Sequence, residues 1–287
     1  MKLVVDSACQ LEYETIRRLG ITVVEYPLYV NGDPYPATID MSREAKDELR
    51  LILKDKNNTV TTSGLTKEAL LKAYRQFPEE QIISLHQSGR ASTATTAVIH
   101  ELLDEEPTLQ VEFIDATHLT AAYTVIVEQV AEAVQAGASL EEVRELVEYI
   151  RSHTRHLGAV YDLFYLHRTG RIGLAKAVLG TAMKIIALLR SSDEPGTLVS
   201  FGKAKNHIQS NQRMVAVIRE DLERWNGTRL RAVISVIGPH EAEAEHLKSL
   251  VEDLDCKTHV EVHYTNHSNM PHAGPDFYDI GYTIHSH

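Results

Sequence analysis

The sequence predicts an α/β fold divided into two domains, and three observations lead to this prediction. Short apolar runs alternate with amphipathic segments through the first half, a pattern typical of a mainly parallel sheet with helices on both faces. The 287 residues and a hydrophobic fraction of 43% are enough for a well-buried core, and this length fits two domains. The second half departs from the regular alternation. We therefore predict an N-terminal α/β domain over residues 1–155 and a C-terminal α/β domain over residues 156–287.

The elements of the first half are marked by apolar runs and by residues that begin or end helices. Gly20 suits the end of the first helix. Ser42 and Thr66 suit the N-caps of two further helices, and Gly137 separates the last two. The expected strands cover residues 3–5, 21–24, 26–30, 81–85 and 109–114, and the expected helices cover residues 11–19, 42–54, 66–77, 91–103, 118–135 and 140–152.

The elements of the second half begin with an extended segment, residues 157–166. The segment 174–189 is apolar on nearly all sides, so it predicts a buried helix. Asn206 suits an N-cap, and Pro239 suits a first helical position. Further strands are expected at residues 197–201, 232–237 and 258–264, helices at residues 206–225 and 239–254, and strand and loop in the tail from residue 267 onward.

Composition and charge exclude several classes of protein. The net charge is -11, and no long run of Lys and Arg occurs, so we expect no binding to nucleic acid or to anionic membranes. The two cysteines, Cys9 and Cys256, form no CxxC pair or disulfide framework, which favours a reducing compartment. The N-terminus turns polar after Val5, and no apolar run is as long as a membrane span. These features predict a cytoplasmic protein that is not an integral membrane protein.

Four loops combine small hydroxyl residues with the expected start of a helix or the end of a strand. They are residues 6–7, 61–64, 87–90 and 115–117. In an open parallel sheet such loops lie beyond the carboxyl ends of the strands, where ligands bind. Free N–H groups and the positive end of the helix dipole favour an anion there. A single loop of this kind is more often only a helix cap. Several in register point to a carboxylate or another anion.

The residues around Ser88 also raise the possibility of a nucleophile. A hydrolase elbow requires G-x-S-x-G, and position 86 is His where that motif has Gly. The two glycine-rich phosphate-binding motifs are absent as well. The histidines of the tail have spacings that superficially suit zinc, but they lie in expected strand and loop, with no H-E-x-x-H and no nearby Cys. We therefore predict no catalytic residue, no metal and no cofactor.

The main basic feature of the second half is the turn at residues 168–171, which contains Arg168 and Arg171. A planar guanidinium suits a carboxylate or a phosphate, although a solvated turn is the simpler interpretation. The apolar segment that follows contains small residues that would leave room for a long apolar ligand, although such a segment is more often core.

Several stretches, taken together and in order, resemble the DegV family, bacterial proteins that bind long-chain fatty acids. The opening Val5-Asp6-Ser7 resembles the strand and Asp-Ser with which that family begins. Further resemblances are carried by a Thr-Ser loop at residues 62–65, a Ser-Gly run at residues 83–94, residues 115–116, a Tyr-Leu to Gly-Arg-Ile signature at residues 165–172 and a His-x-Gly-Pro at residues 272–275. The sequence departs from the family pattern at Arg90, Ala116, Thr169 and residues 64–65.

The resemblance implies a DegV-like fold with a lipid tunnel between the two domains. The fatty-acid carboxylate would be held by the hydroxyls of Thr62 and Ser88 and by the backbone near Gly89. Arg171, His272, Ser63 and Arg90 would lie near the head group. The acyl chain would run along Ala175, Val178, Leu179, Ala182, Ile185 and Ile186.

The resemblance also implies that the protein is a lipid carrier and not an enzyme. In members linked to a kinase, a separate ATP-dependent subunit phosphorylates the bound carboxylate. Two alternatives remain open from the residues alone. One is a serine-dependent esterase or thioesterase that uses Ser88, and the other is a regulatory module with a vestigial lipid pocket.

Overall fold

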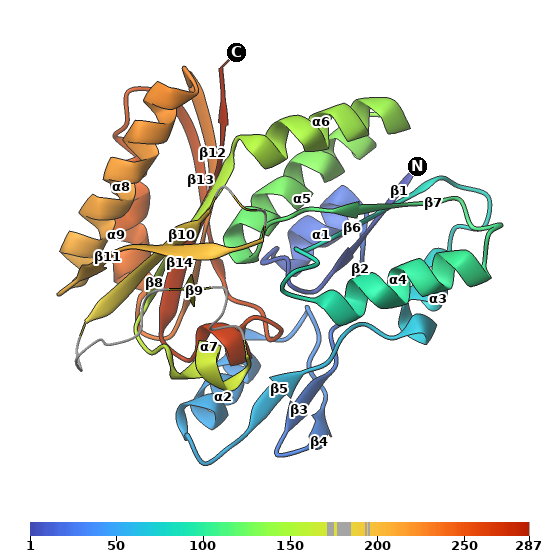
Figure 1. Ribbon diagram of the computed structural model, residues 1–287, viewed down its shortest axis with the longest axis horizontal. Coiled ribbons are helices and arrows are strands. Elements are labelled where there is room, and N and C mark those ends of the chain that lie inside the picture. Colours follow the sequence, from blue (N-terminus) through green and yellow to red (C-terminus); the bar gives the residue numbers. More distant parts are fainter. Residues whose placement is uncertain (171–174, 177–184, 193, 195, 287) are drawn as a thin grey trace.

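The computed structural model describes residues 1–170, 175–176, 185–192, 194 and 196–286. Its strands form three sheets, and helices pack on them (Figure 1). The expectations for Arg171, Val178, Leu179 and Ala182 concern residues outside this described part. The α/β fold class predicted from the sequence is confirmed, and the elements alternate along the first half as expected.

The first sheet is parallel and has the strand order β2-β1-β6-β7. Its central strands β1 and β6 are buried, because helices pack against both faces of the sheet. The strands are β1 (Lys2–Asp6), β2 (Ile21–Val24), β6 (Ile82–His86) and β7 (Val111–Asp115). The helices of this part are α1 (Tyr13–Leu19), α3 (Lys67–Tyr74), α4 (Thr93–Glu105), α5 (Thr120–Gln135) and α6 (Leu140–Ser152).

The second sheet is mixed and has the strand order β13-β12-β14-β8-β10-β11-β9. Its strands are β8 (Thr154–Val160), β9 (Ala175–Lys176), β10 (Ile186–Ser191), β11 (Leu198–Ala204), β12 (Arg229–Ile237), β13 (Lys257–Tyr264) and β14 (Phe277–His285). Its helices are α7 (Phe164–Arg168), α8 (His207–Arg224), α9 (Glu241–Glu252) and α10 (Met270–Ala273).

A third, antiparallel sheet contains β3 (Leu28–Val30), β4 (Asp33–Tyr35) and β5 (Val60–Thr62). This sheet and α2 (Arg43–Lys54) come from the first half of the sequence. Their buried residues Leu28, Leu49 and Val60 nevertheless belong to the same hydrophobic cluster as the large mixed sheet. The division of the chain near residue 155 stays a prediction, since the segment around β3 to β5 packs with the core of the second half.

Helix α5 packs between the parallel sheet and the mixed sheet, and its residues Ala121–Ala131 are all buried. The backbone of α5 approaches β14 very closely at Gly281. A Cβ atom at that position would lie 2.0 Å from the backbone nitrogen of Ala122 and 2.2 Å from the carbonyl carbon of Ala121. Only glycine allows this approach. The contact fixes α5, and with it the loop that precedes α5, against the mixed sheet.

The helix starts follow the chemistry expected from the sequence. The hydroxyls of Ser42 and Thr66 accept hydrogen bonds from the first turns of α2 and α3, and Asn206 caps α8 in the same way. These three predicted caps are confirmed. Ser139 adds a full capping box with Glu142 at the start of α6.

The predicted buried helix at residues 174–189 is wrong in the described part of that segment. Ala175 lies in strand β9, and Ile186 begins strand β10, which pairs with β8 on one side and β11 on the other. A run that is apolar on all sides suits a strand buried on both faces as well as a buried helix, and periodicity alone does not separate the two. The extended segment expected to reach residue 166 ends earlier, because helix α7 begins at Phe164.

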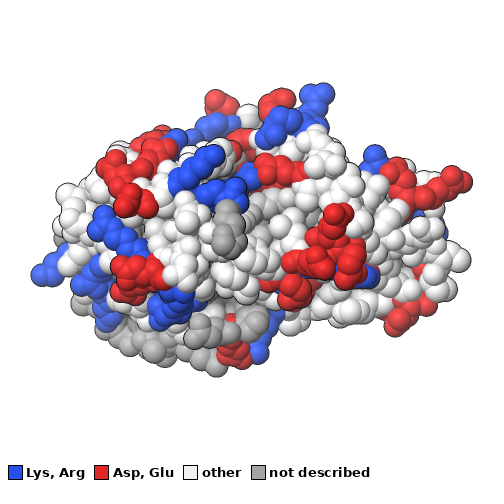
Figure 2. Space-filling model, turned by 90° about the horizontal axis from the view of Figure 1, so that it is seen from above, with Lys and Arg blue, Asp and Glu red and all other residues white. Residues whose placement is uncertain are grey.

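The surface carries charges of both signs. On the face shown in Figure 2, Lys and Arg side chains are interspersed with Asp and Glu side chains. In the described parts of the chain, we find no helix that combines the length and the apolar character needed to cross a bilayer.

Candidate functional site

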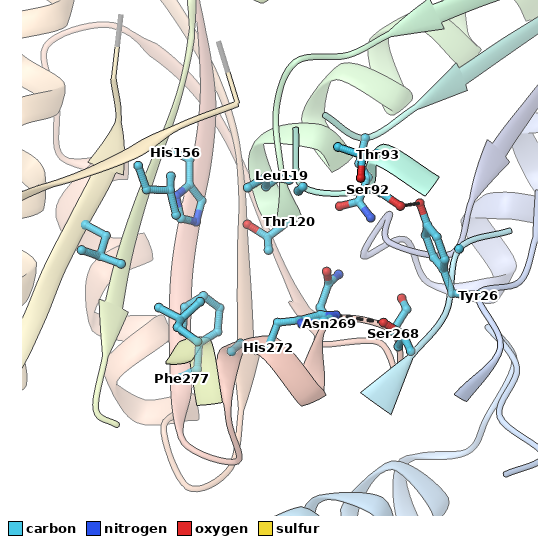
Figure 3. Close-up of a pocket in the computed structure, with 18 of the residues that line it drawn as sticks. Tyr26, Ser92, Thr93, Leu119, Thr120, His156, Ser268, Asn269, His272 and Phe277 are labelled. Atoms are coloured by element: carbon cyan, nitrogen blue, oxygen red, sulfur yellow. Dashed lines mark hydrogen bonds between the residues drawn. The ribbon is translucent and has the colours of Figure 1, made fainter. Parts of the chain in front are cut away.

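A cavity lies between the parallel sheet and the mixed sheet, with a volume of about 150 Å³ (Figure 3). Loops that follow β5, β6, β7 and β13 form its polar side, and residues of the mixed sheet form its apolar side. The lining residues with polar side chains are Tyr26, Thr62, Ser63, Gln87, Ser92, Thr93, Thr120, His156, Ser268, Asn269 and His272. The apolar lining includes Leu119, Val160, Leu166, Leu189, Leu198, Ala273 and Phe277.

Thr62 and His272 meet at the cavity. The Thr62 Oγ1 atom lies 3.0 Å from His272 Nε2, and both residues line the cavity. Thr62 is the last residue of β5, and His272 lies in the short helix α10 after β13. The threonine hydroxyl and the imidazole each carry a donor hydrogen, so a carboxylate that replaces their mutual contact can accept one hydrogen bond from each. Ser63 lines the cavity next to Thr62.

The N-terminus of α4 also borders the cavity. Ser92, Thr93 and Ala94 line it, and Ser92 is the N-cap residue. The Ser92 hydroxyl is fixed by its neighbours, because it donates to Thr95 Oγ1 at 2.8 Å and accepts from the Tyr26 hydroxyl at 3.3 Å. The first N–H groups of a helix and its dipole favour an anion at this end. The start of α4 therefore borders the cavity where the sequence predicted that residues 87–90 would do so.

The cavity wall does not include Ser88, Gly89 or Arg90. The Ser88 side chain is buried beside Gly196, where an added Cβ atom would lie 2.0 Å from the Ser88 hydroxyl oxygen. Its oxygen accepts the backbone N–H of Arg90 at 3.3 Å. The N–H of Gly89 donates to Asp115 at 3.1 Å. The guanidinium of Arg90 is exposed and pairs with Glu194 at 2.5 Å. These contacts hold the loop between β6 and α4 in place.

The residues expected along the acyl tunnel are only partly described. Ala175 lies in β9, Ile185 precedes β10, and Ile186 is a buried residue of β10. Ile185 and Ile186 do not line the cavity. The apolar wall is instead built by Leu189 of β10, Val160 of β8 and other residues of the mixed sheet, which were not among the residues expected along the tunnel.

Several other polar residues of the cavity wall were not singled out from the sequence. His156 of β8 and Thr120 at the start of α5 both line the cavity. Ser268 and Asn269 do so too, and their side chains donate to the backbone carbonyls of Ser7 and Ala8. The only sequence signal for the latter pair is the polar run directly after an apolar strand.

Buried polar side chains form a hydrogen-bonded chain near the carboxyl ends of β1 and β6. Asp6 accepts from His86 at 3.1 Å, the other ring nitrogen of His86 lies 2.7 Å from Ser84 Oγ, and Ser84 contacts the Tyr74 hydroxyl at 2.7 Å. This order of groups resembles that of a serine hydrolase. All four side chains are fully buried, so no substrate reaches Ser84. Asp6 also accepts the N–H of Gln87, which lines the cavity, and the chain therefore orients that loop.

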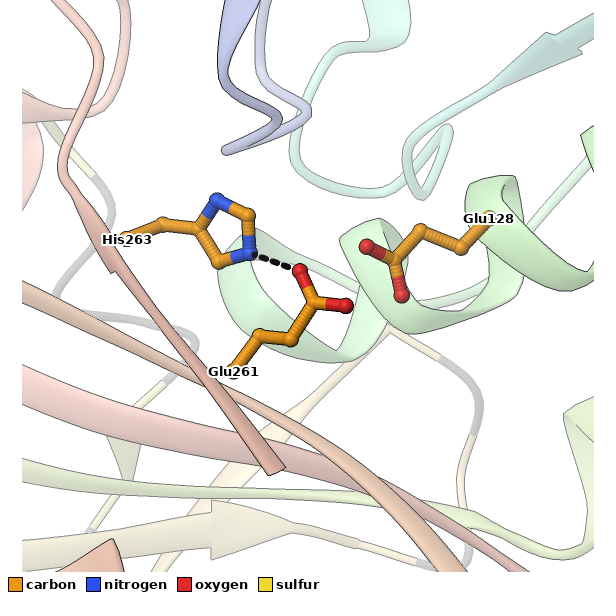
Figure 4. Close-up of side chains that lie close together, drawn as sticks. All are labelled: Glu128, Glu261 and His263. Atoms are coloured by element: carbon orange, nitrogen blue, oxygen red, sulfur yellow. Dashed lines mark hydrogen bonds and ion pairs between the residues drawn. The ribbon is translucent and has the colours of Figure 1, made fainter. Parts of the chain in front are cut away.

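One group of side chains has the composition of a metal site. Ligand atoms of Glu128, Glu261 and His263 all lie within 4.8 Å of one another (Figure 4). Glu128 is already paired with Arg231 at 3.1 Å, and His263 lies 3.2 Å from Glu261. The pKa of Glu261 is lowered to about 2 by its contacts with His263 and His259. Arg231 thus balances the charge of Glu128, and contacts with His259 and His263 occupy Glu261, so the group links α5 to the edge strand β13.

Comparison with known proteins assigns the chain to a family. A model described as an uncharacterised protein of the DegV family matches residues 1–284. The DegV domain-containing protein CPE0304 of Clostridium perfringens is 26% identical over 261 residues, which cover 89% of each chain. The DegV domain-containing protein YteA of Lactococcus lactis is 26% identical over 256 residues, which cover 88% of this chain and 86% of YteA.

Solved structures show the same fold. A DegV family protein from Thermus thermophilus, described as binding fatty acid, matches with a TM-score of 0.86 and 26% identity over 99% of both chains. A stearic-acid-binding protein from Eubacterium ventriosum matches with a TM-score of 0.84 and 22% identity, covering 99% of this chain and 98% of its own. Because the family model extends over nearly the whole sequence and these structures share the whole fold, the chain belongs to the DegV family.

Proposed function

We propose that this protein binds a long-chain fatty acid in the cavity between its two larger sheets. The observation that carries the proposal is the pairing of Thr62 with His272 on a cavity whose other side is mainly apolar. The fatty-acid binding described for the Thermus thermophilus relative supports it. In this proposal, the carboxylate accepts hydrogen bonds from Thr62 and His272 and lies toward the N-terminus of α4.

The chemistry of the cavity suits such a ligand. Each buried methylene of an acyl chain contributes about 0.8 kcal/mol, so a long chain in an apolar pocket binds tightly. The carboxylate needs only a few convergent donors to fix its position. A threonine hydroxyl, an imidazole and helix N–H groups supply these donors without a full opposite charge. A carboxylate held in this way keeps its reactivity toward phosphoryl transfer.

Ser88 and Gly89 have an indirect part in the proposal. Their hydrogen bonds to Arg90 and Asp115 hold the loop that leads into α4, so they position Ser92 and the helix start rather than touching the ligand. Ser63 borders the head group, as it lines the cavity beside Thr62. Arg171 remains a proposed neighbour of the head group on the family resemblance alone.

We further propose that the protein is a non-catalytic lipid carrier of the cytoplasm. It would present the fatty-acid carboxylate to a separate ATP-dependent kinase, which forms the acyl phosphate, and it would need no cofactor of its own. The support for the kinase is the family resemblance of the sequence. The test is a reconstituted reaction with a fatty acid kinase subunit and ATP, in which acyl phosphate should form only when the loaded protein is present.

A direct binding test addresses the cavity itself. The delipidated protein is titrated with stearate, and the affinity is compared with that of the Thr62→Val protein. We expect saturable binding at one site per chain, weakened in the variant. Equal affinity in both proteins would remove Thr62 from the head-group site.

A further inference from the structure

A buried carboxylate lies behind the polar wall of the cavity. Asp279 of β14 is fully buried and accepts four hydrogen bonds. Its donors are the hydroxyls of Thr120 and Ser235, the backbone N–H of Ala121 at 3.3 Å and the Nε2 atom of His156 at 2.8 Å. Both oxygens of the carboxylate are therefore used, and two of the four donor residues, Thr120 and His156, line the cavity.

His156 is incompletely satisfied in this arrangement. It is 4% exposed, and its Nε2 atom is bonded to Asp279. Its other ring nitrogen, Nδ1, is buried and has no hydrogen-bond partner among the described residues. Leaving a buried polar atom unpaired is unfavourable, because the atom has lost its hydrogen bonds to water. A group that arrives with the ligand and pairs with the ring would recover this free energy.

Thr120 is held in an unfavourable backbone conformation beside His156. Its φ is 47°, and a β-branched residue in that region is a genuine outlier. Such strain is unfavourable and is found mainly where a site needs a side chain in a set position. Thr120 and His156 contact the same oxygen of Asp279, so their side chains are neighbours, and Figure 3 shows both on the cavity wall, away from Ser268 and Tyr26.

An unsubstituted alkyl chain forms no hydrogen bond with His156 or Thr120. Burying a carboxylate and an imidazole is costly, and apolar residues of similar volume are often as stable or more stable. Apolar residues on this side of the cavity, among them Val160, Leu189 and Phe277, supply the surface that an alkyl chain requires. The buried pair is thus unnecessary for binding an unsubstituted acyl chain, and it marks a second polar position apart from Thr62 and His272.

We propose that the cavity selects an acyl chain that carries a hydroxyl group, and that this hydroxyl meets His156 and Thr120. The proposal rests on the proposed fatty-acid binding and specifies the class of ligand. A hydroxyl both donates and accepts. In a neutral ring the Nδ1 atom is an acceptor, and the hydroxyl can donate to it. In a charged ring the Nδ1 atom carries a hydrogen, and the hydroxyl can accept from it. An oxo group only accepts, and it would leave the neutral ring unpaired.

The test compares stearate with a panel of hydroxystearates that differ only in the position of the hydroxyl. Delipidated full-length protein is titrated with each ligand. We expect one positional isomer to bind about tenfold more tightly than stearate, which corresponds to about 1.4 kcal/mol, the scale of one recovered hydrogen bond. The paired variant His156→Leu with Asp279→Asn, which leaves no uncompensated charge, should bind stearate more tightly and lose the preference.

The outcomes separate this inference from the proposed function. Thr62→Val serves as the head-group control and should weaken stearate and the preferred isomer by the same factor. If stearate binds as tightly as every hydroxystearate, and the paired variant changes no ratio, the hydroxyl proposal is overturned while fatty-acid binding stands. If no ligand of the panel binds, the proposed function itself fails. His156→Gln, which keeps a polar group, should retain part of the preference and provides a second variant.

Discussion

The hydroxyl of Thr62 lies 3.0 Å from the imidazole of His272, although the two residues are 210 positions apart in the sequence. Thr62 lies in β5 of the antiparallel sheet, in the first half of the chain. His272 lies in the short helix α10, which follows β13 in the second half. The cavity is thus closed by both halves of the chain. A ligand held by this pair contacts both, so its binding should stabilise the whole molecule.

The first prediction concerns Thr62. Thr62→Val keeps the shape of the side chain and removes the hydroxyl, so a bound carboxylate loses a hydrogen bond. A hydrogen bond to a charged group contributes about 1.5–3 kcal/mol, so we expect the affinity for stearate to fall by at least about tenfold. The matched control is Thr61→Val, one residue earlier in β5, because Thr61 points to the other face of the strand and does not line the cavity. A similar loss in both variants would contradict the assignment.

The second prediction separates Ser88 from Ser92. Ser92 lines the cavity at the start of α4, while the Ser88 side chain is buried beside Gly196. We expect Ser92→Ala to weaken stearate binding more than Ser88→Ala, and Ser88→Ala to lower thermal stability more than Ser92→Ala. Calorimetric titration and thermal unfolding of both proteins measure the two effects. A larger loss of stearate affinity in Ser88→Ala than in Ser92→Ala would indicate that Ser88 contacts the ligand.

The third prediction concerns the contact between α5 and β14. Gly281→Ala places a methyl group about 2 Å from the backbone of Ala121 and Ala122, which rigid elements cannot absorb. We expect the free energy of unfolding to fall by at least about 3 kcal/mol, as measured by urea denaturation. Gly202→Ala is the control, because its nearest contact is the end of the flexible Arg213 side chain. Equal stability of the two variants would contradict the close approach of α5.

The fourth prediction is a dependence of stability on pH. Burial, and to a smaller extent the charge of Lys46, lower the pKa of His267 to about 4, while Glu25 lies 3.5 Å away. An unfolded histidine binds a proton near pH 6.5, so the unfolded state is favoured as the pH falls from about 6.5 to about 4. This residue should cost about 3 kcal/mol of unfolding free energy over that window, and no further cost arises below it.

Urea unfolding of the wild type and of His267→Gln across this pH range tests that prediction. The variant should show a flatter dependence, because glutamine does not titrate. A replacement of the exposed His167, which forms no ion pair with a described residue, is the control and should leave the slope unchanged. Parallel curves for wild type and His267→Gln would show that His267 does not titrate as expected.

The parallel sheet was predictable from the sequence, because its apolar runs are short and are bounded by residues with clear roles. Ser42, Thr66 and Asn206 mark helix starts through local hydrogen bonds, which depend on neighbours in the sequence alone. The segment around β10 was not predictable, since a strand buried on both faces and a buried helix share the same apolar pattern.

The candidate site was only partly predictable for a similar reason. Thr62 and His272 could be named from motifs of the family. Which hydroxyl after β6 faces the cavity depends on the path of the loop, and that path is set by contacts of Ser88 and Gly89 with distant residues. No pattern in the neighbouring sequence marks His156 or Asp279 as part of the site. Their side chains come together only because β8 and β14 pair in the folded protein.

The most direct test of the central proposal is the mass of whatever the protein carries from the cell. The full chain is purified under native conditions and denatured, and the released small molecules are identified by mass spectrometry. Fatty-acid binding predicts about one long-chain fatty acid per chain, reduced in the Thr62→Val protein prepared in parallel. A cavity that releases no lipid, or releases a polar metabolite instead, would contradict the account.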